Sequence, residues 1–373
     1  MTVSQGGANV VSQGRANVVA HINRIGTAVP PHDVHAAFVA FARTLLDGHK
    51  QREVFDRMAE RSGIEHRYSH FRPGPPGDVM VDAGGFYRRG AFPSTALRMA
   101  VYAEQAVELA CRAVTALGVA GEGITHLVVA SCTGFTAPGL DQLIAERLGL
   151  GGGLERTLIG FMGCYAAVPA LRAAHHAVRS DPGARVLVVN LELCSLHLQE
   201  TSDLSTILSF LLFGDGASAA LVTAEPGGIA LRDFHSIILP DTQGLITWTI
   251  GDQGFDMHLS GLVPSRIATA LRAERARNDG GGILRGGQVE DTALWAVHAG
   301  GRTVLDAVEI GLDLPGDALA HSRGVLRDVG NMSSATIMFV LARMLQQNTG
   351  PAAGVAMAFG PGVSAETFRF NRL

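Results

Sequence analysis

Three side chains in this sequence carry groups that can form and break a thioester. Cys164 heads an apolar run in the string GCYAAVPAL, His298 ends an apolar run in WAVHAGG, and Asn331 opens a third in GNMSS. A thiol can attack a carbonyl, an imidazole can accept or donate the proton, and an amide can bind the oxygen that gains charge. Their types and positions therefore predict acyl-transfer chemistry.

Cys164 is the candidate nucleophile. Pro169 suits the first turn of a helix, where its missing N–H costs nothing, so we expect Cys164 at a helix N-terminus. The positive end of a helix dipole lowers the pKa of a thiol and favours the thiolate. Gly163 leaves room for an approaching acyl group. The alternative is a structural cysteine packed in the core.

His298 and Asn331 each have a second explanation as well. His298 ends a predicted strand and precedes a glycine-rich turn at Gly300, which lets a substrate come close. Its imidazole can take up the thiol proton, or it can be a satisfied core histidine. Asn331 can cap the helix that follows it, or its amide can stabilise charge on a thioester oxygen beside His298.

The order of the three residues separates two classes of enzyme. His298 follows Cys164 by 134 residues, and Asn331 follows His298 by 33. Papain-like proteases have the same order, but their cysteine lies near the mature N-terminus in a C-G-S-C-W-like context. Here 163 residues precede the cysteine and that context is absent. A cysteine hydrolase is thus a weakly supported alternative.

Composition excludes several other classes. The 373 residues are 47% hydrophobic with a net charge of −4 and no block of one sign, so nothing indicates a nucleic-acid partner. The four cysteines lack C-x-x-C spacing, which excludes a zinc site or redox dithiol and predicts free thiols in a reducing compartment. No apolar run reaches the roughly 18 residues of a membrane span, and no signal peptide is evident. We expect a cytoplasmic protein without a metal.

The elements that position these side chains alternate between helices and nearly continuous apolar strands. This alternation is typical of a sheet covered on both faces. We expect helices at 35–61, 98–117, 139–148, 303–310 and 333–347, and strands at 125–130, 185–193, 217–223, 293–297, 354–359 and 365–370.

Three regions follow from the remaining patterns. Residues 3–10 nearly repeat as 11–18, and we predict that residues 1–20 form a mobile N-terminal extension. A Pro-Gly segment near residue 226 divides the rest into an N-terminal half, 21–227, with the cysteine, and a C-terminal half, 228–373, with the histidine and asparagine.

Five strings give the chain a specific resemblance to type III polyketide synthases, the chalcone synthase-like branch of the thiolase superfamily. They are GCYA, FGDGA, HAGG, GNMSSA and FGPG, in family order. The FGPG loop with Gly360 and Pro361 separates this family from β-ketoacyl-acyl carrier protein synthase III. The resemblance implies an α/β protein with the αβαβα thiolase-like fold, two pseudo-symmetric halves and a homodimer. It also implies an acyltransferase that condenses malonyl-CoA onto an acyl-CoA starter and binds no further cofactor.

The resemblance also implies the roles of the three reactive residues. Cys164 would hold the starter acyl group as a thioester. His298 and Asn331 would bind the malonyl thioester carbonyl, promote loss of CO₂ and stabilise the enolate. An imidazolium–thiolate pair of His298 and Cys164 would keep the nucleophile charged at neutral pH.

Further matches concern the coenzyme A site and the gate of the cavity. Phe213 matches a gating phenylalanine, whereas Met257 stands at the position of the second gatekeeper of plant enzymes. Arg57 and Arg61 match two of three basic residues that bind coenzyme A phosphates, and Gly300 borders the same site. An exposed helix face is the alternative explanation for both arginines.

The identity of the starter rests on small residues that look bacterial. Thr133, Ala137 and Cys194 match the lining of a long acyl tunnel in mycobacterial alkylpyrone synthases, so we expect a long-chain acyl-CoA and an alkylpyrone or alkylresorcinol product. The alternative is 1,3,6,8-tetrahydroxynaphthalene synthase, which uses malonyl-CoA alone. Cys132 fits that enzyme, but His197 stands where it carries a tyrosine. A non-catalytic acyl-binding relative is the alternative from another class.

Overall fold

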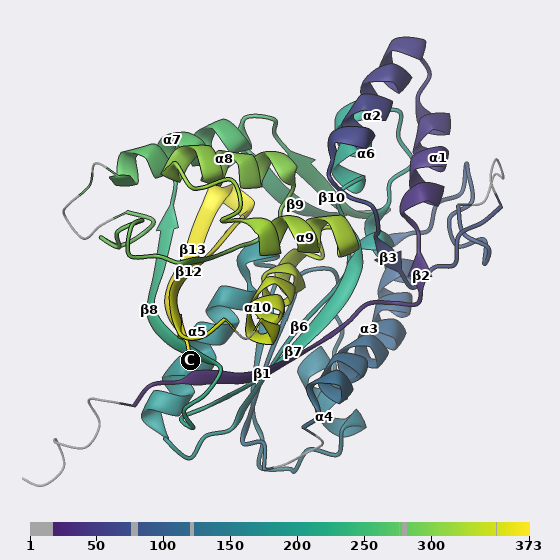
Figure 1. Cartoon of the computed structure of the whole chain (residues 1–373). Helices are drawn as coiled ribbons and strands as arrows, with labels where there is room; N and C mark the ends of the chain where they lie inside the picture. Colours follow the sequence, from purple (N-terminus) through teal and green to yellow (C-terminus); the bar gives the residue numbers. More distant parts are fainter. Residues whose placement is uncertain (1–17, 76–80, 120–122, 276, 278–281, 348) are drawn as a thin grey trace, which may run out of the picture.

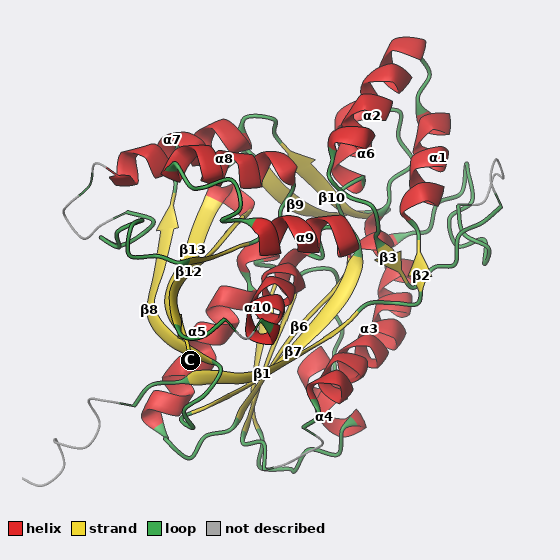
Figure 2. Ribbon diagram, in the orientation of Figure 1, coloured by secondary structure: helices red, strands yellow, loops and turns green. Residues whose placement is uncertain are grey.

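The computed structural model describes residues 18–75, 81–119, 123–275, 277, 282–347 and 349–373 (Figure 1). Most of the predicted N-terminal extension, residues 1–17, lies outside the described residues. The described chain forms an α/β molecule in which helices cover both faces of a large strand system (Figure 2).

Nine strands of the described residues form one mixed sheet. Their spatial order is β11 (Leu294–Val297), β12 (Ala352–Gly360), β13 (Ser364–Arg372), β8 (Ile229–Ile238), β1 (His21–Ala28), β7 (Asp215–Thr223), β6 (Val186–Leu193), β4 (His126–Ser131) and β5 (Glu155–Gly160).

The two ends of this sheet repeat one pairing pattern. In the N-terminal half, β4 is parallel to β6, β6 is antiparallel to β7, and β7 is antiparallel to β1. In the C-terminal half, β11 is parallel to β12, β12 is antiparallel to β13, and β13 is antiparallel to β8. Only two residue pairs of β1 and β8, at His21 and Ile22, join the halves. The repeated order is the duplication that the resemblance implied.

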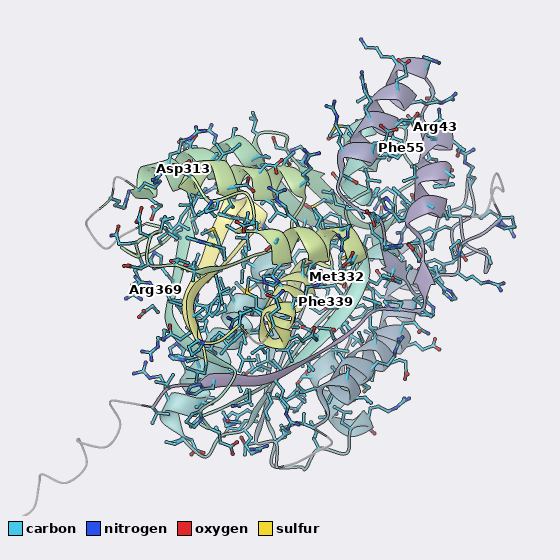
Figure 3. The ribbon with its side chains drawn as sticks, viewed as in Figure 1. Arg43, Phe55, Asp313, Met332, Phe339 and Arg369 are labelled. Carbon is cyan, nitrogen blue, oxygen red and sulfur yellow. The ribbon has the colours of Figure 1, made fainter. Side chains whose placement is uncertain are left out.

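Helices form three layers around the two halves of the sheet. The inner layer is α5 (Ala167–Ser180) and α10 (Thr336–Gln346), and the outer layers are α3 (Thr95–Leu117) with α4 (Leu140–Arg147) and α7 (Val263–Arg275) with α8 (Arg302–Leu312). Strand alternation creates the layers: Val128 packs toward the inner helices and its neighbour Leu127 toward α3. Met332 and Phe339 lie in this central core (Figure 3).

Smaller elements stand around the ends of the strands. They are α1 (His35–Leu45), α2 (His49–Arg61), α6 (Leu204–Phe210), α9 (Ala320–Val329), the β9 (Ile246–Gly251)–β10 (Gly254–Leu259) hairpin and the short pair β2 (His32–Asp33) and β3 (Tyr68–Ser69). The region 35–61, which was expected to be helical, forms two helices, because Gly48 between them adopts an extended conformation. Helices α1, α2 and α6 project from the body of the molecule (Figure 1).

In the described part of the chain, four 3₁₀ turns lie where strands and inner helices begin or end. They are η1 (Gly163–Tyr165), η2 (Cys194–His197), η3 (Ser333–Ala335) and η4 (Pro361–Val363). Each contains or adjoins a residue singled out from the sequence. Among the described helices, none combines the length and hydropathy needed to cross a bilayer.

Candidate active site

The turn η1, which carries the candidate nucleophile Cys164, depends on glycines that let two loops touch. Gly163 has φ +75°, and a Cβ there would lie 2.5 Å from Cδ of Pro361. A Cβ on Gly360 would lie 2.6 Å from the ring of Tyr165 and 3.4 Å from the backbone nitrogen of Cys164. The turn that carries the thiol is therefore packed directly on the carboxyl end of β12.

His298 reaches the same end of the sheet by strand pairing. It follows β11, which is parallel to β12, and its backbone N–H donates to the Met357 carbonyl at 2.8 Å. The turn η1 with Cys164 packs on the carboxyl end of β12, and β11, the neighbour of β12, leads to His298. Both residues therefore lie near the carboxyl ends of β11 and β12. His298 is only 1% exposed, and neither ring nitrogen has a hydrogen-bond partner in the described part of the chain.

Asn331 caps the helical segment that follows it, and its role toward a thioester oxygen stays a prediction. Its Oδ1 accepts from the backbone N–H of Ser333 at 2.8 Å and from the Thr336 hydroxyl at 3.3 Å, which is capping of the helical segment. Its Nδ2 donates to the carbonyl of Gly300 at 3.2 Å, two residues after His298. The amide is thus fixed with Nδ2 as the donor beside the histidine turn.

Backbone pairing also brings Phe213 next to Asn331. Phe213 and Asn331 form an isolated parallel bridge, and the N–H of Gly214 donates to the Asn331 carbonyl at 2.9 Å. Ser333 has φ +47°, a conformation that is strained for a side chain other than glycine. Strain of this kind gathers at functional sites, and Ser333 lies against the cysteine pocket.

Burial holds both reactive groups in their neutral forms. It raises the pKa of the Cys164 thiol to about 11, although hydrogen bonds from Ser333 and Asn331 act in the opposite direction. Burial lowers the pKa of His298 to about 3. At neutral pH these shifts favour a protonated thiol at Cys164 and a neutral imidazole at His298. Burial thus acts against the expected thiolate–imidazolium pair, which stays a prediction.

Sequence reasoning assigned no role to Glu192, a fully buried carboxyl beneath the cysteine. It accepts hydrogen bonds from the backbone N–H of Cys132 at 3.0 Å, the Thr133 hydroxyl at 2.8 Å and the Ser334 hydroxyl. Burial raises its pKa. A lone carboxylate in the apolar strand 186–193 was the signal that could have identified it.

A small apolar cavity, the catalytic pocket, lies beside Cys164 and has a volume of about 40 Å³. Most of the expected cavity residues line it: Cys132, Thr133, Cys194, His197, Phe213, Met257 and Pro361. Ala137 does not, because it is exposed on the loop before α4. Phe210, Ile246, Trp248 and Ser333 also line the pocket and were not found from the sequence.

His197 is a structural part of the pocket wall. Its Nε2–H donates to the Thr133 carbonyl at 2.7 Å and its Nδ1 accepts from the N–H of Phe255 at 3.0 Å, so its partners fix the tautomer. The ring stacks on Phe255 at 4.2 Å and meets Trp248 edge-on at 5.2 Å. Burial lowers its pKa to about 3, which keeps it neutral.

A wider cavity of about 800 Å³, the entrance cavity, opens between α2, α6, α7 and the start of α8. Arg61 and Gly300 line it, whereas Arg57 lies one turn earlier on α2, outside the lining. Arg302 also lines it and was missed. Its guanidinium donates to the Arg61 carbonyl at 3.1 Å and lies 3.6 Å from Asp306.

The strand order, the three helical layers and the cysteine turn together define a class. This is the class of thiolase-like α/β proteins. Within the described residues, no three metal-ligating side chains gather in a cluster that could hold a metal ion.

The comparisons identify the family. The sequence matches the chalcone and stilbene synthases over both of their domains, the N-terminal domain at residues 3–226 and the C-terminal domain at 231–373. It is 34% identical to the alpha-pyrone synthesis polyketide synthase-like Pks18 of Mycobacterium tuberculosis over 95% of this chain and 91% of that protein. It is 33% identical to bisdemethoxycurcumin synthase of Oryza sativa subsp. japonica over 93% of this chain and 91% of that protein.

A solved structure agrees. PKS-I from the brown alga Ectocarpus siliculosus superposes with a TM-score of 0.83 at 30% identity, covering 97% of this chain and all of the other. The chain belongs to the chalcone and stilbene synthase family and is a type III polyketide synthase, an acyltransferase. This membership decides against the cysteine-hydrolase and non-catalytic alternatives. Enzymes of this family use coenzyme A thioesters as substrates.

Proposed function

We propose that this synthase loads a long-chain acyl group from coenzyme A onto Cys164 and extends it with malonyl-CoA. The extended chain then cyclises to an alkylpyrone or alkylresorcinol. The observation that carries the proposal is the arrangement of a half-buried thiol, an imidazole and a fixed amide donor around the carboxyl end of β12.

Loading begins with a neutral thiol. Because burial raises the pKa of Cys164 and lowers that of His298, the proton leaves sulfur as the sulfur attacks the thioester carbonyl. An unpartnered nitrogen of His298 accepts that proton, and coenzyme A leaves as its thiol when the proton is returned. The acyl group is then held on Cys164 as a thioester.

Extension uses the same groups as hydrogen-bond donors. His298 and Asn331 bind the thioester oxygen of malonyl-CoA, so the C–C bond to the carboxylate can break with charge moving onto that oxygen. The resulting enolate carbon attacks the acyl group on Cys164, and the thiolate leaves. Two neutral donors in a buried site are suited to this task, because they stabilise charge where it develops and do not reorganise.

The substrate classes are supported by two cavities. The catalytic pocket is almost entirely apolar in its lining, which suits an aliphatic acyl chain. The entrance cavity is large enough for a coenzyme A arm and carries two arginines, Arg61 and Arg302, for its phosphates. A curated relative whose printed name includes alpha-pyrone synthesis supports a pyrone product.

The deciding experiment offers acyl-CoA starters from acetyl to stearoyl together with malonyl-CoA, with products identified by mass spectrometry. We expect alkylpyrones or alkylresorcinols that retain the starter chain. Cys164→Ala should abolish product and retain binding of the CoA thioester, while Cys111→Ala on α3 should behave as wild type. A product built from malonyl-CoA alone, indifferent to added starters, would instead identify a tetrahydroxynaphthalene synthase.

We also propose that the enzyme is a homodimer that pairs through β5. This strand ends the sheet, pairs only with β4 and is exposed along nearly its whole length. Leu158 on β5 is 44% exposed and Phe135 on the neighbouring loop 45%. An edge strand with apolar side chains in water is a template for pairing, and a second copy would cover it.

The proposed location is the cytoplasm. All four cysteines are free. Free thiols persist where the compartment is reducing, which is the support for this location.

A further inference from the structure

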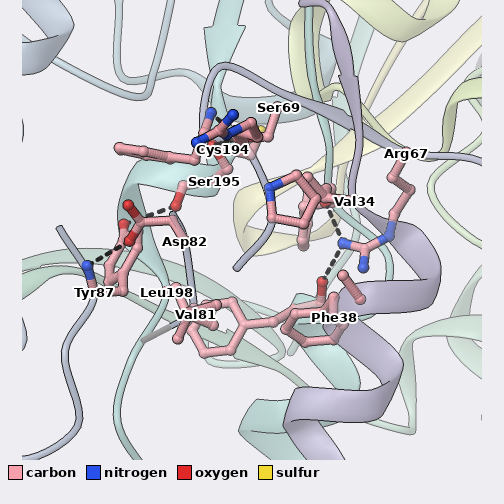
Figure 4. A pocket seen from close by; sticks show the side chains of 16 residues that line it. Val34, Phe38, Arg67, Ser69, Val81, Asp82, Tyr87, Cys194, Ser195 and Leu198 are labelled. Carbon is pink, nitrogen blue, oxygen red and sulfur yellow. Dashed lines mark hydrogen bonds between the residues drawn. The ribbon is translucent and has the colours of Figure 1, made fainter. Parts of the chain in front are cut away.

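Arg67 is a buried arginine that contacts both segments of the backbone bridge between Phe213 and Asn331. It is only 3% exposed. Its Nη1 donates to the carbonyls of Phe213 at 2.6 Å and Phe210 at 2.9 Å, and its guanidinium lies over the Phe38 ring at 4.6 Å (Figure 4). The charged end of Arg67 is thus fixed on the backbone that carries Phe213.

The stem of Arg67 packs on the other segment of the bridge. A Cβ on Gly330, the residue before Asn331, would lie 2.7 Å from Cγ of Arg67. Two backbone hydrogen bonds, each 2.9 Å long, join Asn331 to the residues on either side of Phe213. The Phe213 carbonyl between them accepts from Arg67 instead. One arginine therefore contacts both chains that the bridge joins.

Stability alone does not explain an arginine at this position. Burial lowers the pKa of Arg67 to about 10, so the side chain is still a cation at neutral pH. Its buried Nη2 has no hydrogen-bond partner in the described part of the chain. Keeping a charge and an unpaired donor from water is costly, and apolar side chains of similar volume often serve a fold equally well. What the guanidinium adds is two directed hydrogen bonds to the backbone around Phe213.

We propose that Arg67 is a positioning residue for decarboxylation of the extender. It holds the bridge, and with it the amide of Asn331 that binds the malonyl thioester oxygen in the proposed function, on which this inference rests. A misplacement of about 1 Å in a group that orients a reaction can lower the rate roughly 100-fold. Loading of Cys164 does not use this amide. Loss of the Arg67 bonds should therefore slow decarboxylation and spare loading.

The test measures the two steps separately in Arg67→Met and in Arg98→Met. Decarboxylation is followed as acetyl-CoA formed from malonyl-CoA in the Cys164→Ala background. Loading is followed as the mass of Cys164 acylated by lauroyl-CoA in chains that retain the cysteine. Arg98 is the matched control, because it is also buried, also has an unpartnered Nη2 in the described part of the chain, and donates to the carbonyls of Leu196 and Leu198 rather than to the bridge.

Relative to loading, decarboxylation should fall at least tenfold in Arg67→Met and change less than twofold in Arg98→Met. Arg67→Lys retains a charged donor and should recover part of the loss. Equal falls of both steps in Arg67→Met, or the same ratio in both methionine variants, would indicate a purely structural role and overturn the inference. Failure of the wild type to load lauroyl-CoA would count against the proposed function and leave the comparison of decarboxylation rates intact.

A double-mutant cycle tests whether Arg67 acts through Asn331. Asn331→Ala should slow decarboxylation, and adding Arg67→Met should slow it less than twofold further, because the amide to be positioned is already gone. A further fall of tenfold or more would reveal an independent effect and overturn the inference. If Asn331→Ala decarboxylates malonyl-CoA as fast as its parent, the proposed function fails whatever Arg67 does. If thermal unfolding shows that Arg67→Met does not fold, Arg67→Lys takes its place in the cycle.

Discussion

At the scale of single residues, the site is defined by groups kept from water. The Cys164 thiol, the His298 imidazole and the Glu192 carboxyl each have a pKa moved toward the neutral form by burial. We expect such a site to keep its nucleophile protonated until a substrate arrives, in contrast to enzymes that maintain a permanent thiolate.

Alkylation of Cys164 should report this state. Because its pKa is raised to about 11, the thiolate fraction grows with pH throughout the neutral range. The rate of iodoacetamide labelling of the free enzyme should therefore rise about tenfold per pH unit between pH 7 and 9. Labelling is followed by mass spectrometry, with Cys164→Ala as the control for other thiols. A plateau already reached at pH 7 would show a standing thiolate–imidazolium pair.

At the scale of elements, two short loops and the end of one strand hold the nucleophile. Gly163 and Gly360 have no side chains because η1 and β12 touch at those positions. On the other side of the site, α2 and α8 meet through Arg61 and Arg302 at the entrance cavity. Substitutions at Gly163 and at Arg61 test these two contacts separately.

Gly163→Ala should lower the stability of the fold by more than conformational strain alone predicts. The left-handed φ of +75° costs about 1–2 kcal/mol for alanine, and the contact with Pro361 adds about 1–3 kcal/mol. Gly149→Ala is the matched control, since its φ is +64° with nothing within 4 Å. Thermal unfolding should show a clearly larger fall in Tm for Gly163→Ala. Equal falls would mean that the Pro361 contact contributes nothing.

Arg61→Ala and Arg57→Ala separate the entrance cavity from the exposed face of α2. Removing a charge-assisted bond to phosphate costs about 1.5–3 kcal/mol, so KM for the acyl-CoA should rise at least about tenfold in Arg61→Ala. Arg57 does not line the cavity, so Arg57→Ala should change KM less than twofold. Steady-state kinetics at low and high salt checks this prediction. Screening by salt should raise KM for the acyl-CoA more in the wild type than in Arg61→Ala, which lacks the charge. The opposite ranking of the two variants would refute the cavity assignment.

At the scale of the whole molecule, the exposed strand β5 predicts the assembly. Wild type should have about twice the chain mass of 39.1 kDa by light scattering. Leu158→Asp puts a charge on the proposed interface and should shift the enzyme toward the monomer. Ile310→Asp on α8, at a residue 59% exposed, is the control and should remain dimeric. A wild-type monomer would contradict the proposal directly.

Much of this architecture could be read from the sequence, but not all of the site. Cys164, His298 and Asn331 were predicted because they stand at element boundaries in recognisable strings. Glu192 and Trp248 were missed, since their roles depend on contacts with residues 60 and 116 positions away along the chain. Ala137 was expected in a tunnel, yet it is exposed on the loop before α4 and does not line the catalytic pocket. The spacing of residues along a chain does not show which of them line the same cavity.

The repeated strand order has a consequence for how this enzyme can change. Cys164 comes from one copy of the duplicated unit, and His298 and Asn331 come from the other. The catalytic pocket is shared as well, because Trp248 and Met257 of the second copy line it beside Cys194 of the first. Neither copy carries a complete pocket, so neither can be replaced without the other adapting to it. After the duplication, the two halves of this gene could change only together.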